Sequence, residues 1–117
     1  MTRLRRGENV IATSTRGDPD NIIFLGAHSD SVEAGPGIND NGSGSAAILE
    51  LAIRLSRYLI TNTVRFGWWT GEEEGLLGSE HYVETLPAEE AMKIRLYLNF
   101  DMIASGNGKL CRFVPRL

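Results

Sequence analysis

The sequence predicts an α/β protein, a three-layer α/β/α sandwich with a mostly parallel mixed sheet. Short apolar and β-branched runs alternate with segments of helical periodicity, as in chains built from βαβ units. Residues 22–27 are apolar in both alternating sets, which is typical of a strand covered by helices on both faces. Acidic and histidine side chains follow three of the predicted strands, and parallel strands bring their carboxyl ends to one edge of a sheet.

The first half of the chain contains two short strands, a loop and a helix. We expect the strands at residues 10–15 and 22–27, separated by the turn-forming residues 17–21, and a hairpin between them is one interpretation of this turn. The glycine-rich loop at 31–44 needs unusual backbone angles. The helix begins near Ser45 and runs to about Tyr58, with Ser43 or Ser45 as its N-cap.

The second half repeats the alternation. Residues 63–70 are rich in aromatic and β-branched residues and predict a third strand, followed by the acidic turn 71–75. A helix is expected at about 77–85, a short helical turn at 88–93 and a fourth strand at 94–102. The segment 106–117 has no clear period, and we interpret it as an atypical tail on a single partial domain spanning 1–117.

Composition excludes several classes of function. The net charge of −3 gives no electrostatic reason to expect nucleic-acid binding, and no apolar run is long enough to span a membrane. The only cysteine, Cys111, excludes an internal disulfide and a thiolate metal cage. The first ten residues lack the apolar region of a signal peptide. The residues leave the oligomeric state open.

The candidate site consists of acidic and imidazole groups that follow the predicted strands. They are His28, Asp30, Asp40, Glu72, Glu73 and Asp101. Carboxylates that converge without a cation raise one another's pKa, whereas two divalent ions compensate three such charges. A histidine combined with carboxylates suits a borderline metal such as zinc. The sequence therefore predicts a metal centre, with Asp40 on its glycine-flanked loop as the candidate bridge.

The other acids have more specific expected roles. Asp30, two residues after His28, can accept the second ring N–H of that histidine and fix its tautomer. Of the adjacent pair Glu72 and Glu73, one binds metal while the other moves a proton between water and a leaving amine. Each of these residues alone also has a structural explanation, as a turn residue or a solvated charge. The glycine-rich loop lacks the lysine of a phosphate loop, and His81 on its helix is expected to be a surface residue.

Four sequence blocks resemble one known family. GAHSDS, GPGINDNGSGSAAILELA, WWTGEEEGLLGSEHYV and YLNFDMI are similar, in this order, to zinc-dependent aminopeptidases with a cocatalytic two-zinc site, secreted microbial leucine-aminopeptidase-like members especially. The resemblance implies His28 and Asp101 on the first zinc, Asp40 bridging both and Glu73 on the second. It also implies Glu72 as the catalytic acid/base, Asp30 as the support of His28, and a cis peptide bond between Asp40 and Asn41.

The chain also departs from the family. The second zinc of these enzymes takes a further histidine downstream of the NFDM block, and no histidine follows Asp101 here. We therefore expect a fragment with weak or no activity, in which one metal position lacks a ligand.

The leading hypothesis is a secreted zinc aminopeptidase that acts on peptides with a free N-terminus. The alternatives are a non-catalytic module with a peptidase-like fold, and a related two-metal carboxypeptidase or deacylase.

Overall fold

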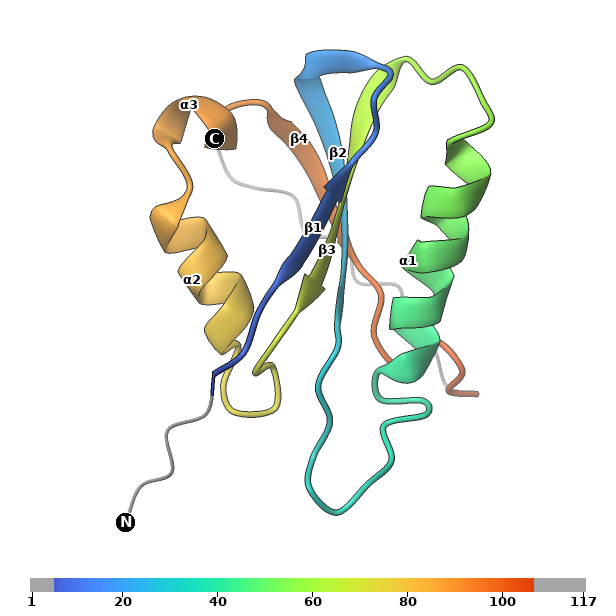
Figure 1. Ribbon diagram of the computed structural model, residues 1–117, viewed down its shortest axis with the longest axis vertical. Helices are drawn as coiled ribbons and strands as arrows, with labels where there is room; N and C mark the ends of the chain where they lie inside the picture. The colour runs from blue at the N-terminus through green and yellow to red at the C-terminus, as the bar shows by residue number, and fades with distance from the viewer. Residues whose placement is uncertain (1–5, 107–117) are drawn as a thin grey trace.

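The computed structural model describes residues 6–106. Within this range the elements are β1 (Val10–Thr13), β2 (Asp18–His28), α1 (Gly42–Leu55), β3 (Asn62–Trp69), α2 (Leu77–Thr85), α3 (Ala88–Ala91) and β4 (Ile94–Asn99). The strands form one sheet in the order β1-β3-β2-β4. β2 is parallel to β3 and to β4, and β1 is antiparallel to β3. Helix α1 covers one face of the sheet, and α2 and α3 lie on the other (Figure 1). This arrangement confirms the predicted fold class.

Part of the sequence prediction falls outside this range. All of the expected tail except Gly106 lies beyond the described residues. None of the helices in residues 6–106 has the length and apolar character needed to cross a membrane.

The expected hairpin between the first two strands is wrong. Val10 of β1 is paired with Trp68 of β3, so β1 lies next to β3 and not next to β2. The reason is burial. All four residues of β1 are exposed, as suits an edge strand, whereas β2 is buried from Ile22 to His28 except at Ile23. A strand with two apolar faces is most stable in the middle of the sheet, where β3 and β4 occupy both of its edges.

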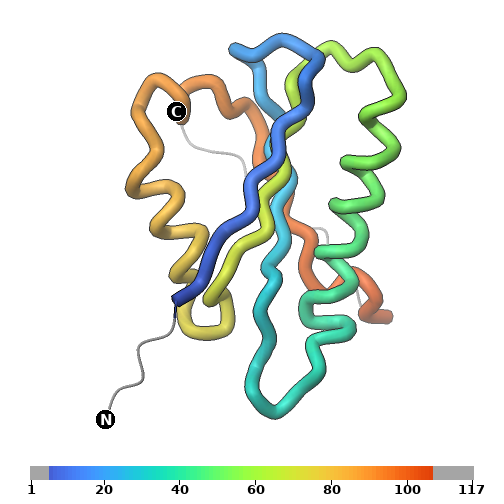
Figure 2. Tube along the Cα trace, in the orientation of Figure 1, coloured from blue at the N-terminus to red at the C-terminus, as the bar shows by residue number. Residues whose placement is uncertain are grey.

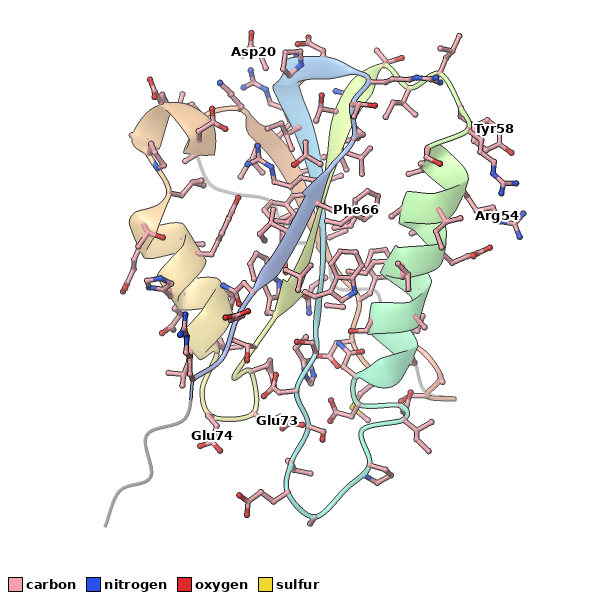
Figure 3. All side chains as sticks on the ribbon, in the orientation of Figure 1. Asp20, Arg54, Tyr58, Phe66, Glu73 and Glu74 are labelled. Carbon is pink, nitrogen blue, oxygen red and sulfur yellow. The ribbon has the colours of Figure 1, made fainter. Side chains whose placement is uncertain are left out.

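The main core lies between the sheet and α1. Successive side chains of a strand point to opposite faces, so Leu25 and Ala27 of β2 project together toward α1. There they pack with Ile48 of the helix, which is completely buried, and with Val64 and Phe66 of β3. Phe66 lies in the middle of the sheet in Figure 3. This packing fixes the helix against the strands and therefore fixes the position of the loop that leads into it.

The opposite face of the sheet carries an aromatic cluster under α2. The ring of Phe24 lies 5.5 Å from that of Trp69, 5.6 Å from that of Tyr82 and 5.7 Å from that of Tyr97, measured between centroids. The indole N–H of Trp69 donates to the Tyr97 hydroxyl at 2.9 Å. A Cβ atom at Gly26 would overlap both of these polar groups, so the close packing here requires glycine.

Candidate metal centre

The site lies where the three parallel strands end. Because β2, β3 and β4 run in the same direction, the loops that follow them meet at one end of the molecule, the lower end in Figure 2. Glu73, in the loop after β3, lies at this end near the loop that follows β2 (Figure 3). Open α/β sheets generally place ligands at this edge.

His28, the last residue of β2, occupies the centre of the site. Its side chain is 2% exposed. Its Nε2 atom lies 2.9 Å from Oδ1 of Asp40, 3.6 Å from Oδ1 of Asp101 and 3.9 Å from Oε2 of Glu72. These carboxylates come from three different loops. The tertiary structure thus brings together groups that the sequence places at three separate strand ends.

Asp30 joins two of these loops. Its carboxylate accepts the backbone N–H of Glu72 at 3.0 Å and that of Glu73 at 3.2 Å. The Nδ1 atom of His28 lies 3.1 Å from the carbonyl oxygen of Asp30 and 3.5 Å from its carboxylate. The hydrogen-bond partner of Nδ1 is therefore the backbone carbonyl of Asp30, whereas Nε2 faces Asp40. The carboxylate, which the sequence assigned to the histidine, lies at ion-pair distance from it and in addition holds the Glu72–Glu73 backbone in place.

The ligand atoms form two overlapping clusters. His28, Asp40 and Asp101 make one, and His28, Glu72 and Glu73 make the other, with the atoms of each cluster within 4.8 Å of one another. The first cluster contains the three residues that the family resemblance assigns to one zinc. The peptide bond between Asp40 and Asn41 is cis, as the resemblance implies.

The electrostatics of the site are dominated by negative charge. Within the described part of the chain, no lysine or arginine forms an ion pair with the carboxylates around His28. Burial lowers the pKa of His28, but the neighbouring carboxylates, with Asp101 and Glu72 contributing most, outweigh it and raise that pKa. Burial also raises the pKa of Glu72. The attraction of His28 opposes this shift, and repulsion from Asp101 and Glu73 adds to it, so that the pKa of Glu72 is raised overall. The arrangement requires a source of positive charge.

The residues fit a zinc ion. An imidazole nitrogen with carboxylate oxygens is a donor set that zinc accepts. A further observation concerns Glu73, whose Oε1 atom is buried and has no hydrogen-bond partner in the described residues. Buried polar oxygens are nearly always paired, so an unpartnered one beside a cluster of ligands is the atom that a cation would satisfy. His81 is exposed on α2 and is in neither cluster, in agreement with the expected surface position.

Sequence reasoning missed the importance of Asn41. It expected Ser43 or Ser45 to cap α1, but the helix begins at Gly42 and its N-cap is Asn41, whose side chain accepts the N–H of Gly44. Both serine hydroxyls donate elsewhere, that of Ser43 to the carbonyl of residue 39 and that of Ser45 to the carbonyl of residue 28. Asparagine is as good an N-cap as serine, so the sequence contained the signal.

The fold matches a part of a zinc aminopeptidase domain. A zinc aminopeptidase from Bacillus subtilis, BSAP, superimposes with a TM-score of 0.75 at 38% identity, over 81% of this chain and 24% of that one. An aminopeptidase from Aneurinibacillus sp. strain AM-1 gives a TM-score of 0.74 at 40% identity, over 80% of this chain and 24% of that one.

The particular family follows from the sequence comparison. The model of Peptidase family M28 matches residues 9–114, and the chain belongs to this family. The chain is 61% identical over 99 residues to an aminopeptidase of Pseudomonas aeruginosa, covering 85% of this chain and 18% of that protein. It is 57% identical over 100 residues to aminopeptidase Y of Saccharomyces cerevisiae, covering 86% of this chain and 19% of that protein. The chain therefore spans about a fifth of the length of these relatives. The resemblance seen in the sequence is confirmed.

Proposed function

We propose that this chain carries part of the catalytic centre of a zinc aminopeptidase, which hydrolyses the N-terminal peptide bond of its substrate with an activated water molecule. The observation that carries the proposal is the position of His28, whose Nε2 lies within 4 Å of carboxylates from three separate loops. The aminopeptidases among the relatives support the choice of substrate, a peptide with a free N-terminus.

The proposed roles follow the first cluster and, for the second metal position, the family resemblance. His28, Asp40 and Asp101 would hold one zinc ion, and Asp40 and Glu73 would contribute to a second position. The metal, when bound, supplies the Lewis acidity that lowers the pKa of water and polarises the substrate carbonyl. Glu72 accepts a proton from the attacking water at its carboxylate and delivers it to the leaving amine. Asp30 keeps Glu72 in position through the hydrogen bond to its backbone N–H.

The two metal positions are not equivalent. The first has one imidazole and two carboxylates. The second has no histidine of its own, because the sequence contains only two histidines and His81 lies outside both clusters. We therefore expect the purified chain to bind one zinc tightly and a second weakly, and to show slow hydrolysis. Equilibrium dialysis against zinc measures the stoichiometry, and two tight zinc ions per chain would contradict this expectation.

A substitution of Glu72 tests the chemistry. We expect Glu72→Gln to retain zinc and to lower kcat by a factor of about 10² to 10⁴, the usual contribution of a general base. Glu74→Gln is the matched control, because Glu74 lies in the same loop, is exposed and belongs to neither metal cluster. Hydrolysis of leucine p-nitroanilide at high protein concentration is the assay.

The outcomes separate the proposal from its alternatives. Full activity of zinc-loaded Glu72→Gln would mean that Glu72 is not the base. Failure of the unsubstituted chain to bind zinc would remove the proposal altogether. Hydrolysis of N-acetylated peptides in preference to peptides with a free amine would favour a carboxypeptidase or deacylase instead.

A further inference from the structure

Asp40 and Asp101 belong to loops that are far apart in the sequence, yet both face the same imidazole nitrogen. Asp40 lies at 2.9 Å from Nε2 of His28 and Asp101 at 3.6 Å. Neither residue belongs to a strand or helix. The sheet alone therefore does not determine the distance between them, and other contacts must hold the two loops together.

The segment that carries Asp101 leaves the sheet immediately before it. Its last backbone bond to the sheet is from the N–H of Phe100 to the carbonyl of Gly26, at 2.8 Å. Met102, the residue after Asp101, has a φ of 49°, in the left-handed region that residues other than glycine, asparagine and aspartate rarely adopt. Such a conformation persists only where surrounding contacts enforce it.

The first set of contacts comes from Asn41, which directly follows Asp40. The residue is 1% exposed. Its Nδ2 donates to the carbonyl of Phe100 at 2.8 Å, and its Oδ1 accepts the N–H of Gly44 at 3.0 Å and, at 3.4 Å, that of Met102. One amide thus caps α1 and holds the residues on both sides of Asp101. The approach is so close that a Cβ atom at Gly44 would overlap the carbonyl oxygen of Phe100.

The second set comes from Asn39, which directly precedes Asp40. Its Nδ2 donates to the hydroxyl of Ser105 at 3.0 Å, and its Oδ1 accepts the N–H of Ala104 at 3.2 Å. The hydroxyl of Ser43, in the first turn of α1, also lies 3.2 Å from this Oδ1. Both neighbours of Asp40 therefore bind the segment that carries Asp101, and both also bind the start of α1.

We propose that Asn39 and Asn41 are positioning residues for the metal centre. Through their side-chain amides they bracket Asp40 and fasten the Asp101 segment to it, so that both carboxylates reach the imidazole of His28 at once. The inference rests on the proposed zinc site and adds to it the residues that set its geometry. Neither asparagine is a metal ligand in this arrangement.

The substitution Asn41→Asp separates the two roles of Asn41. An aspartate keeps the oxygen that accepts the N–H of Gly44, and it is a favourable N-cap. However, it replaces the donor that faces the carbonyl of Phe100 by a second oxygen, and two facing oxygens repel each other. The added negative charge by itself would strengthen cation binding, so weaker binding cannot be an effect of charge. We expect the dissociation constant for Zn²⁺ to rise at least tenfold.

The matched control is Asn21→Asp. Asn21 also makes hydrogen bonds with both atoms of its amide, to Asp18 and from Arg95. However, it lies just before the buried part of β2, and that part of the strand separates it from His28. This variant is expected to bind zinc like the unsubstituted chain. Asn39→Ser is a second test variant, and it adds no charge. If Asn41→Asp does not fold, Asn39→Ser alone tests the positioning role. Its Zn²⁺ dissociation constant is also expected to rise at least tenfold.

The absorption spectrum of bound Co²⁺ is a measurement that general destabilisation of the fold would not change. At saturation, the visible absorption bands of Co²⁺ report the arrangement of its ligands, and we expect them to differ between the unsubstituted chain and both test variants. Unchanged affinity in the variants would overturn this inference and leave the zinc site intact. Weaker binding with unchanged bands would mean that only folding is affected, and would also overturn it. No zinc binding by the unsubstituted chain would overturn both proposals.

Discussion

Removal of the Asp30 carboxylate is expected to destabilise the chain even when no metal is present. The carboxylate is 23% exposed and accepts the backbone N–H groups of Glu72 and Glu73 at 3.0 and 3.2 Å. These bonds connect the loop after β2 to the loop after β3. Because water has little access to the carboxylate, the two N–H groups would not recover full hydration in an alanine variant.

The magnitude follows from two opposing contributions. A hydrogen bond to a charged group contributes about 1.5–3 kcal/mol, so the loss of two costs at most about 6 kcal/mol. The negative charge of Asp30 repels that of the nearby Glu72 and contributes to the raised pKa of Glu72. The substitution removes this repulsion. The hydrogen bonds are shorter-range and more direct, so their loss dominates. We expect Asp30→Ala to cost about 2–4 kcal/mol and Asp30→Asn, which keeps one acceptor, about 1–3 kcal/mol.

Urea unfolding in the presence of EDTA measures these values without any contribution from bound metal. The control is Asp20→Asn, since Asp20 is 73% exposed and lies 3.8 Å from the ammonium of Lys93. An exposed ion pair of this kind contributes at most about 1 kcal/mol. An Asp30→Ala variant as stable as the control would refute the reasoning. So would an effect that appears only when zinc is added, because Asp30 would then act on the metal and not on the loops.

Two further predictions concern the helices. Ile48→Ala is expected to lower the free energy of unfolding by about 2–5 kcal/mol because Ile48 is completely buried. Leu49→Ala is the control and should lower it by less than about 1 kcal/mol, since Leu49 is 51% exposed. Similar values for the two variants in urea unfolding would contradict the packing of α1 on the sheet. Hydrogen bonds from Lys93 and Arg65 hold the pKa of Glu90 below its ordinary value of 4.5. The contribution of the Glu90 carboxylate to stability is therefore present above that value and is lost as the pH falls through the folded-state pKa. When the pH is lowered from about 5 to 3, Glu90→Gln should consequently lose less stability than the unsubstituted chain. Equal losses would show that the Glu90 hydrogen bonds do not contribute.

Local patterns identified much of this protein. The continuous apolar run after residue 21 predicted a central strand because only a strand covered on both faces has no polar side. The helix at 77–85 was predicted with its observed bounds, since Pro87 limits it and helical spacing defines its interior. The end-of-strand positions of His28 and Asp101 predicted that they would lie near each other, because parallel strands end at the same edge. The roles of these residues in catalysis are still predictions.

Long-range contacts decided the rest. The choice of β3 as the partner of β1 depends on which edges of the sheet are already occupied, and no local pattern records that. The carboxylate of Asp30 binds a backbone 42 residues away in the chain, and the amide of Asn41 binds one 59 residues away. A sequence specifies which donors and acceptors exist, and periodicity shows which of them follow a strand. Their pairing depends on distances between loops, which are set only when the sheet and α1 pack together.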